Sequence, residues 1–309
     1  MRNTFAQTFH EAAKSDPRVC VVVADISPAG AMDNFRQEFP DRFINTGVAE
    51  QIMIGMVAGM SARGLKPFAY TIATFALYRP FEFIRDDLCY QNLPVTVVGI
   101  GGGVTYSTLG STHHAQEDVA IACALPNMRV IAPCDPEETR AATNWCIQQE
   151  EGPVYLRLGK AGEPILSIEE SEKFEYGKIR HLRRGEDICI IGYGPILKTG
   201  IEIADELIQQ GKKISVISAH TLKPLDRAGI NKMLMEYKKI IILEEMSPVG
   251  GLSDAIRVHA WNNQAKCSIK SFNLKDEFIH VYGKHQDILN AHGISKENII
   301  DEIKKYYKN

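Results

Sequence analysis

Short apolar runs alternate along the chain with longer segments in which apolar residues recur every three or four positions. The run Val19–Asp25 consists mostly of β-branched residues, which suits a strand covered on both faces of a sheet. Residues 4–14 have helical spacing instead. The alternation predicts further strands at 43–44, 67–70, 95–100, 128–132 and 154–158, and helices at 79–92, 118–124 and 136–149. Such alternation indicates a parallel sheet with helices on both sides.

The alternation weakens after residue 165 and resumes near residue 187. The intervening segment, residues 166–186, mixes charged residues with poor periodicity, as expected of a linker between domains. Apolar runs then predict strands at 188–192, 214–218, 240–244 and 269–273, and helices at 196–210, 252–260 and 296–308. We therefore predict an α/β protein with two doubly wound sheets, a parallel-sheet domain over residues 1–165 and a smaller domain over residues 187–309.

The segment Arg42–Arg63 contains an acidic residue in an unusual setting. Glu50 falls in the first turn of a helix whose following residues are apolar or small on nearly every face, so the helix is expected to be buried all round. Gly55 and Gly59 lie one turn apart in it and would let another backbone approach closely. The helix dipole favours the ionised form of Glu50, whereas burial favours the neutral form. This conflict suits proton transfer, but a simple capping role explains a first-turn acid as well.

Other candidate functional residues follow the predicted strands, because ligands of open parallel sheets bind beyond the carboxyl ends of the strands. The candidates are Asp25, the aromatic residues Phe75 and Tyr78, and His113 in a glycine-rich loop. Each also has a structural interpretation: Asp25 could simply turn the chain, and the aromatic pair could simply fill a core. His113 and its neighbour His114 lack spaced Cys or acidic ligands, so we predict no metal site on this chain.

Composition narrows the class of protein. A chain of 309 residues is too long for one compact core, and its 45% hydrophobic and 24% charged residues are ordinary for a globular protein. A net charge of −3 gives no reason to expect nucleic acid or an anionic membrane as partner. The seven cysteines are scattered and form no CxxC pair, which indicates reduced thiols in a cytoplasmic protein. We find no signal peptide or apolar run of membrane length.

Four stretches of the chain, in this order and at this spacing, resemble the C-terminal half of transketolases. They are RFINTGVAEQIMIGMVAGMSARGLKPFAYT, TFALYRPFEFIRDDLCYQNLPV, STHHAQEDVAIACALPNMRVIAPCDPEE and GPVYLRLGK. The resemblance covers nearly the whole chain and implies a pyrimidine-binding domain followed by a transketolase C-terminal domain. The motif by which the family holds Mg²⁺ and the cofactor diphosphate belongs to the other half, and no Gly-Asp dipeptide occurs here. The resemblance therefore implies one subunit of a split transketolase.

The resemblance assigns cofactor and catalytic roles to particular positions. Glu50 would hydrogen-bond N1′ of the aminopyrimidine of thiamine diphosphate and so promote removal of the thiazolium C2 proton. Phe75 and Tyr78 would stack on and surround the pyrimidine ring, and Asp25 would lie near the cofactor. His113 would face substrate hydroxyls, where a neutral imidazole can donate or accept. Glu50 and His113 are thus the expected catalytic residues.

The expected substrate-binding residues, besides His113, are four cations. Arg2 and Lys160 match phosphate-binding positions of transketolases, although a lysine binds as a point charge rather than as a bidentate fork. Arg79 and Arg157 instead match positions at which the related deoxyxylulose-phosphate synthases carry arginines.

The substrate end also departs from the transketolase pattern at three positions. Ala29 stands where the family has a serine, Gly101 where it has a histidine, and Leu109 where it has an acid. We therefore expect a site for the substrate phosphate to be present, but with residues that differ from those of transketolases. Pentose and hexose phosphates do not follow from the sequence as substrates.

The resemblance implies a ketol transferase that moves a two-carbon unit from a ketose or ketose phosphate to an aldose. The pyrimidine end of thiamine diphosphate would bind here, and Mg²⁺ would be bound by a separate N-terminal subunit. A homodimer contact would complete a heterotetramer. The alternatives are a deoxyxylulose-phosphate-synthase-like enzyme, the β subunit of a 2-oxo-acid dehydrogenase, and a non-enzymatic relative that serves assembly or regulation. The Thr112-His113 loop and YLRLGK favour transketolase over the dehydrogenase.

Overall fold

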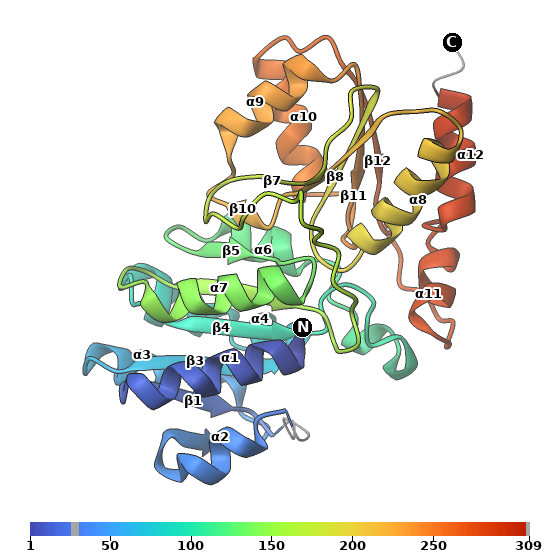
Figure 1. The fold of residues 1–309 in the computed structure, drawn as a ribbon. Helices are drawn as coiled ribbons and strands as arrows, with labels where there is room; N and C mark the ends of the chain where they lie inside the picture. Colours follow the sequence, from blue (N-terminus) through green and yellow to red (C-terminus); the bar gives the residue numbers. More distant parts are fainter. Residues whose placement is uncertain (26–30, 307–309) are drawn as a thin grey trace.

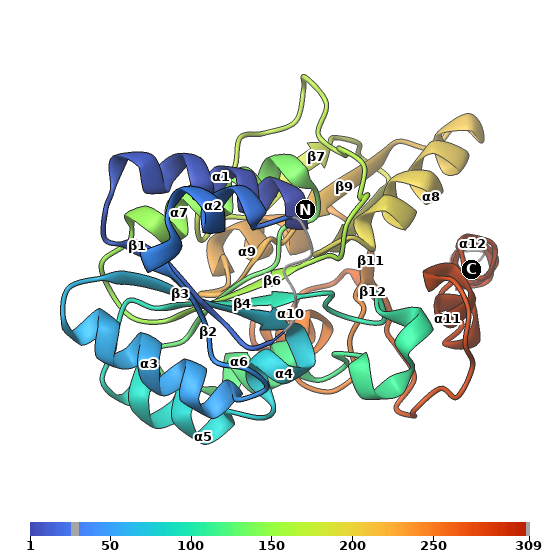
Figure 2. The ribbon, with the colours of Figure 1, turned by 90° about the horizontal axis from the view of Figure 1, so that it is seen from below.

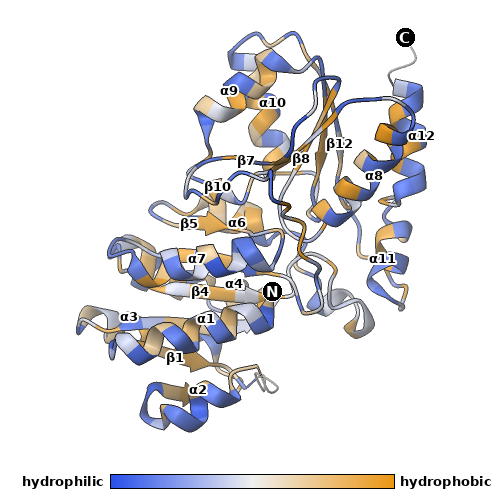
Figure 3. Ribbon diagram, in the orientation of Figure 1, coloured by the Kyte–Doolittle hydropathy of each residue, from blue (hydrophilic) through white to orange (hydrophobic). Residues whose placement is uncertain are grey.

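Two sheets of mostly buried strands form the centres of two α/β domains (Figure 1). The computed structural model describes residues 1–25 and 31–306. Hydrophobic residues follow the strands and the inner faces of the helices (Figure 3), as the continuous apolar runs of the sequence require. The predicted fold class, two doubly wound sheets, is confirmed. Within the described residues, no helix is long and apolar enough to cross a membrane.

The first sheet has seven strands in the order β10-β5-β6-β4-β3-β1-β2, and all its pairs are parallel except β10 with β5. The strands are β1 (Val19–Val23), β2 (Phe43–Asn45), β3 (Lys66–Ile72), β4 (Thr96–Ile100), β5 (Arg129–Ile131), β6 (Val154–Leu158) and β10 (Thr221–Lys223). The edge strand β10 comes from the second half of the chain, and Thr221 lies opposite Ile131. The two domains therefore share a sheet edge, which the sequence did not predict.

Helices cover both faces of the first sheet (Figure 2). One face carries α1 (Arg2–Ser15), α2 (Asp33–Glu38) and α7 (Pro136–Gln148). The other carries α3 (Glu50–Ala62), α4 (Ala73–Leu77), α5 (Phe81–Phe83), the π-helical segment η2 (Ile84–Tyr90) and α6 (Asp118–Ala124). Short 3₁₀ turns are η1 (Pro40–Arg42), η3 (Ser107–Leu109) and η4 (Ser111–His113). The helix expected at 79–92 is observed as α5 followed directly by η2, and it begins after Pro80, where α4 and this helix are separated.

The second sheet has the order β12-β11-β8-β9-β7. Its strands are β7 (Arg180–Arg183), β8 (Ile188–Gly192), β9 (Ile214–Ser218), β11 (Lys239–Leu243) and β12 (Ser268–Phe272). One face packs against α8 (Leu197–Gln209), α11 (His285–Ala291) and α12 (Lys296–Tyr306), and the other against α9 (Arg227–Glu236) and α10 (Leu252–Asn262) (Figure 1).

Strand β7 lies inside the segment that the sequence suggested as a linker. It pairs antiparallel with β9, and its residues alternate between buried Arg180 and Leu182 and half-buried His181 and Arg183. The strand has the expected period of two, but charged residues occupy three of its four positions and hide the apolar signal. The second domain therefore begins earlier than the sequence indicated.

Helix α3 differs from the expectation that it is buried all round. Its inner side, which includes Met53 and Val57, is fully buried, but Ile52 on the outer side is 59% exposed. Gly55 and Gly59 are also exposed, and a Cβ added at either would meet nothing within 4 Å. A single chain therefore leaves an apolar, small-residue stripe of α3 uncovered, because the sequence pattern reflects both the internal core and this outer face.

Candidate active site

Glu50 lies at the start of α3, just beyond the carboxyl end of β2, and only 2% of its surface is exposed. Its expected position in a nearly dry first turn is confirmed. The carboxylate Oε1 accepts a hydrogen bond from a guanidinium N–H of Arg79 at 2.7 Å. No hydrogen bond to Oε2 is found among the described residues. One oxygen of this acid is thus fixed by a cation, and the other is left available.

Arg79 also connects Glu50 to an aromatic group. Its guanidinium carbon lies 3.9 Å from the centroid of the Phe75 ring, a cation–π distance. The ring of His113 meets the same Phe75 ring in an edge-to-face arrangement, with 5.2 Å between centroids. Phe75 belongs to α4 and His113 to η4, so the fold brings together three separate segments. We call Glu50, Arg79, Phe75 and His113 the active-site row.

The His113 imidazole favours its neutral form. Partial burial lowers the pKa of His113, and the positive charge of Arg79 lowers it further. Nδ1 lies 3.0 Å from the Thr112 hydroxyl, and Nε2 has no hydrogen bond among the described residues. A neutral imidazole can donate from one nitrogen and accept at the other, which suits contact with a polar ligand.

The Tyr78 hydroxyl forms its hydrogen bonds with Glu117 rather than with a residue of the active-site row. It donates to Glu117 Oε2 at 2.8 Å and accepts from the Glu117 backbone N–H at 3.2 Å. Burial raises the pKa of Tyr78, and the carboxylates of Asp118 and Glu117 raise it further. Tyr78 borders an apolar cavity of about 600 Å³ together with His114 and Phe278. The structure therefore does not bring the Tyr78 hydroxyl into the active-site row.

Among the described residues, no hydrogen bond or ion pair joins Asp25 or Arg2 to the active-site row. Asp25 is exposed, has a left-handed φ of 47° and donates its backbone N–H to Asn45 Oδ1 at 3.1 Å. Arg2 is in the first turn of α1. Burial raises the pKa of Tyr106, and the nearby charge of Arg2 opposes this rise. Ala29, a departure from the family pattern, lies outside the described residues.

Arg157 is a core residue in this structure, only 3% exposed. Its Nε donates to Asp118 Oδ2 at 2.7 Å, and its Nη2 donates to the backbone carbonyl of Glu245 at 2.9 Å. Burial opposes the charge of Arg157, but Asp118, Tyr193 and Tyr155 together outweigh it, and the pKa of Arg157 is raised. The structure therefore does not bring Arg157 to a surface that a substrate could reach, in contrast to the role expected from the resemblance.

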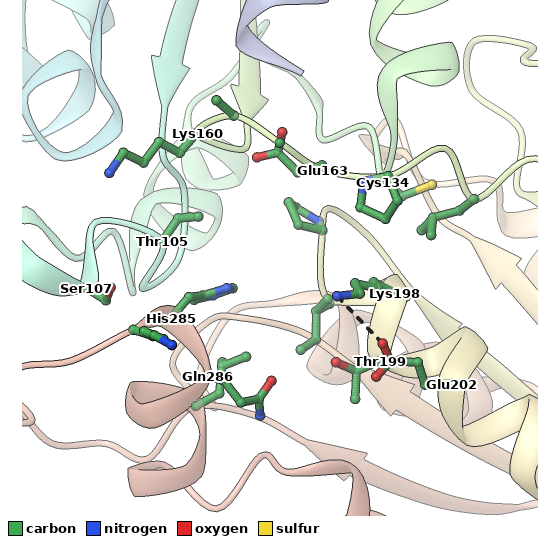
Figure 4. A pocket seen from close by; sticks show the side chains of 18 residues that line it. Thr105, Ser107, Cys134, Lys160, Glu163, Lys198, Thr199, Glu202, His285 and Gln286 are labelled. Atoms are coloured by element: carbon green, nitrogen blue, oxygen red, sulfur yellow. Dashed lines mark ion pairs between the residues drawn. The ribbon is translucent and has the colours of Figure 1, made fainter.

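Lys160 lies at the edge of a cavity of about 440 Å³ between the two domains (Figure 4). Cys134, Lys198 and His285 line the same cavity, but Lys160 extends away from them in Figure 4. Its ammonium instead lies 5.1 Å from the centroid of the Tyr106 ring. Lys160 is thus directed toward the segment that carries the loop of His113.

Two family models cover most of the chain. Residues 1–162 match the pyrimidine-binding domain of transketolase, and residues 177–299 match the transketolase C-terminal domain. The chain belongs to the transketolase family. One subunit of the apulose-4-phosphate transketolase of Phocaeicola vulgatus is 32% identical over 307 residues, which cover 99% of this chain and 97% of that protein.

Further comparisons agree with this assignment. A solved structure described as a split gene transketolase, inactive beta4 tetramer, superposes with a TM-score of 0.87 at 32% identity and covers 98% of this chain and 97% of that one. The 1-deoxy-D-xylulose-5-phosphate synthase of Clostridium tetani is 31% identical over 98% of this chain, which spans 49% of that protein. The expected resemblance to the C-terminal subunit of a split transketolase is confirmed.

In this member of the transketolase family the second domain holds the loop that carries His113. Ser111 Oγ donates to the backbone carbonyl of Ile279 at 2.5 Å. Glu245 Oε2 accepts from the Val104 backbone N–H at 3.1 Å and lies 3.0 Å from His285 Nε2. Burial alone would raise the pKa of Glu245, but His285 and Arg157 lower it. The C-terminal domain therefore supports the site through loop contacts.

Two features of this transketolase-family site were not found from the sequence. Arg79 was expected to bind substrate, but its contacts with Glu50 and Phe75 were not expected. Tyr106 was not singled out at all, although its ring lies 6.5 Å from that of His113 between centroids. No local pattern marks an aromatic residue in a glycine-rich loop as part of a site. Within the described residues, no group of three or more His, Cys, Asp or Glu side chains could hold a metal ion.

Proposed function

We propose that this chain is the C-terminal subunit of a thiamine-diphosphate-dependent transketolase, which transfers a two-carbon ketol unit from a ketose or ketose phosphate to an aldose. The observation that carries the proposal is the active-site row, in which Arg79 links a buried acid to a flat ring and a neutral imidazole meets the same ring. When bound, thiamine diphosphate supplies the electron sink needed to break a carbon–carbon bond next to a carbonyl.

The residues present suit the pyrimidine end of that cofactor. The half-buried ring of Phe75 offers a flat apolar partner, and aromatic stacking contributes on the order of 1 kcal/mol beyond the burial of area. Glu50 would hold or share a proton at Oε2, while Arg79 fixes Oε1. Only 2% of Glu50 is exposed, so bulk water has little access to a proton held there.

His113 would bind the hydroxyl or carbonyl oxygen of a substrate above Phe75. Its neutral form, favoured by burial and by Arg79, allows it either to donate or to accept there. Arg2 and Lys160 are the proposed cations at the far end of the substrate, and Asp25 and Tyr78 are proposed to lie near the cofactor in the assembled enzyme. For Arg157 we propose an indirect role, because its guanidinium is bonded inside the core.

We further propose that a separate N-terminal subunit holds Mg²⁺ and the diphosphate of the cofactor and covers the active-site row. Relatives of nearly the same length as this chain are named as single subunits of transketolases, which supports this division of the enzyme. The exposed stripe of α3 is proposed to contact a second copy of the chain, because Ile52, Gly55 and Gly59 present apolar and small surface to solvent in the single chain. Two copies of each subunit would then form a heterotetramer.

A second candidate activity is that of a deoxyxylulose-phosphate-synthase-like enzyme. Arg79, which occupies a position shared with those synthases, contacts both Glu50 and Phe75, and one such synthase is 31% identical to this chain. That reaction would join pyruvate to glyceraldehyde 3-phosphate and release CO₂. Transketolase chemistry releases none, so CO₂ separates the two candidates.

The deciding experiment is reconstitution. The chain is purified with and without its diphosphate-binding partner and supplied with thiamine diphosphate, Mg²⁺ and a panel of ketose donors and aldose acceptors. We expect ketol transfer only in the complex, and weak cofactor binding by the chain alone. Tight, Mg²⁺-dependent binding to the isolated chain in calorimetry would refute the division into subunits, and CO₂ release from pyruvate would favour the second candidate.

A further inference from the structure

The side chain of Tyr106 fills the space in front of Gly101. A Cβ at position 101 would overlap the Tyr106 ring, and the φ of Gly101 is +76°, in the left-handed region. Both the space and the backbone therefore require glycine at this position. Gly101 and Tyr106 form a matched pair in which the missing side chain makes room for the ring.

Tyr106 lies between the imidazole and the cations of the proposed substrate end. Its ring meets that of His113 at 6.5 Å between centroids, with an interplanar angle of 60°. The Lys160 ammonium lies 5.1 Å from the same ring, and the charge of Arg2 reaches its phenol strongly enough to oppose the effect of burial on the pKa of Tyr106. Tyr106 is 8% exposed, and its hydroxyl has no hydrogen bond among the described residues.

The neighbours of Tyr106 face a different region. Thr105 and Ser107 both line the interdomain cavity, as Figure 4 shows, whereas Tyr106 between them contacts Gly101 and His113. One short segment thus has two sides, one toward the cavity and one toward the active-site row. This makes Ser107 a matched control for substitutions of Tyr106.

We propose that Tyr106 is a specificity-determining residue that closes the substrate end of the cleft and selects short, uncharged aldose acceptors. The proposal rests on the proposed function, because it assumes that the acceptor binds at His113. With the ring in place, a ligand at His113 meets the ring before it reaches Lys160, whose ammonium lies against that ring. A longer acceptor with a terminal phosphate must displace the ring to reach Lys160.

The ring also engages the cation that a phosphate would need. A lysine ammonium above an aromatic face is held by the negative charge density of that face, so its transfer to a phosphate loses this attraction. Removal of the ring would both open the path and free Lys160. The selectivity of the enzyme should then shift toward anionic acceptors, without any change at Glu50 or Phe75.

The test uses the reconstituted two-subunit enzyme with one ketose donor and two acceptors, glycolaldehyde and ribose 5-phosphate. The measured quantity is the ratio of kcat/KM for ribose 5-phosphate to kcat/KM for glycolaldehyde. Tyr106→Ala should raise this ratio by about tenfold or more, as expected when a steric and electrostatic barrier in a pocket is removed. Tyr106→Phe and the control Ser107→Ala should keep the wild-type ratio. A ratio that changes less than about twofold in Tyr106→Ala would overturn the proposal.

A second measurement separates this proposal from the proposed function. Inorganic phosphate is titrated into the isolated wild-type chain, Tyr106→Ala and Tyr106→Leu, and thermal unfolding confirms which variants are folded. The bulkier Tyr106→Leu serves if Tyr106→Ala fails to fold. We expect phosphate to bind more tightly to the variants, because the Lys160 ammonium loses its contact with the ring and becomes free to bind the anion. If the wild-type enzyme transfers no ketol unit, the proposed function fails, and equal phosphate affinities in the folded chains would still overturn the role of Tyr106.

Discussion

A guanidinium nitrogen of Arg79 lies 2.7 Å from Oε1 of Glu50, and the two side chains differ sharply in exposure, at 41% and 3%. The pair joins the start of α3 to the chain that follows α4. The buried carboxyl depends on this more exposed cation as a hydrogen-bond donor, so displacement of Arg79 would leave a buried acceptor unsatisfied. One oxygen of Glu50 is thus anchored, and the other is the one proposed to hold a proton.

Replacement of Glu50 tests that role directly. Glu50→Gln should lower kcat of the reconstituted enzyme by about 100-fold or more, because an amide cannot exchange the proton that a carboxyl can. The amide oxygen can still accept from Arg79, so the unfolding temperature should barely change. The matched control is Glu137→Gln, which alters an exposed first-turn acid of α7. Full turnover in Glu50→Gln would support a capping role or a non-enzymatic relative.

His113 should act on the substrate rather than on the cofactor. His113→Ala should reduce kcat by about tenfold or more, since a hydrogen bond to reacting oxygen atoms is lost. Cofactor affinity, measured by calorimetry on the complex, should fall much less, because Phe75 and Glu50 remain. Equal losses in turnover and affinity would mean that the imidazole mainly supports the Phe75 ring, which it contacts.

We expect Arg157 to stabilise the folded chain. Arg157→Leu leaves Asp118 as an uncompensated charge in the core, which typically costs about 3–5 kcal/mol of the free energy of unfolding. The matched control, Arg183→Leu, breaks a more exposed pair with Asp205 and should cost about 1 kcal/mol or less. Urea unfolding of the wild type, the two arginine variants and Asp118→Asn measures both effects. A loss below about 1 kcal/mol in Arg157→Leu would contradict the structural role.

The uncovered stripe of α3 should mediate assembly. A Cβ added at Gly55 meets nothing within 4 Å in the single chain, so Gly55→Leu should keep the fold while blocking close approach of a second copy. We expect the dissociation constant of the oligomer to rise by about tenfold or more, equivalent to about 1.4 kcal/mol. Analytical ultracentrifugation measures this, with Arg140→Leu on the exposed side of α7 as control. An unchanged mass distribution would exclude this face as the interface.

Acid should destabilise the protein through His114. Burial, followed by the charge of His292, lowers the pKa of His114 from 6.5 to about 4. Between these two values the unfolded chain binds a proton that the folded chain rejects, so the free energy of unfolding falls as the pH falls. The loss approaches the order of 3 kcal/mol near pH 4, and above about pH 6.5 the full stability is present.

The measurement compares unfolding free energies at about pH 7.5 and pH 4.5 in the wild type and in His114→Phe. The variant should show a shallower pH dependence, because one of the groups that titrate differently in the folded and unfolded chains is gone. A residual slope remains, since burial also lowers the pKa values of His113, His220 and His292. Equal slopes in the two proteins would mean that the His114 ring is solvated in solution.

The strands were the most predictable part of the fold. Runs such as 19–23 and 188–192 are apolar on every position, and a strand buried on both faces has that composition wherever it lies in a chain. Strands β7 and β10 escaped prediction because each is short and polar, and each forms only by pairing with a strand distant in sequence. Local sequence contains no information about such pairing partners.

The candidate site was predictable only in part. The burial of Glu50 could be predicted, because the residues that follow it in the helix, 51–60, are mostly apolar or small and such a helix packs against a core. The cation at its carboxyl did not follow, because Arg79 lies beyond the end of α4 and meets Glu50 only through tertiary contact. For Arg157, the sequence suggested a contact with a ligand that the structure does not show. Its guanidinium instead bonds to Asp118, which comes from another part of the chain.

The sequence by itself determined the two-domain α/β class, the membership in the transketolase family and the buried start of α3. These features depend on the spacing of hydrophobic residues and on the order of motifs, both of which are properties of the linear sequence. Tertiary structure alone decided which side chains meet at Glu50, that Tyr106 covers Gly101, and that one face of α3 stays open. These outcomes depend on contacts between residues far apart in sequence, whose geometry is set by how the sheets and loops pack together.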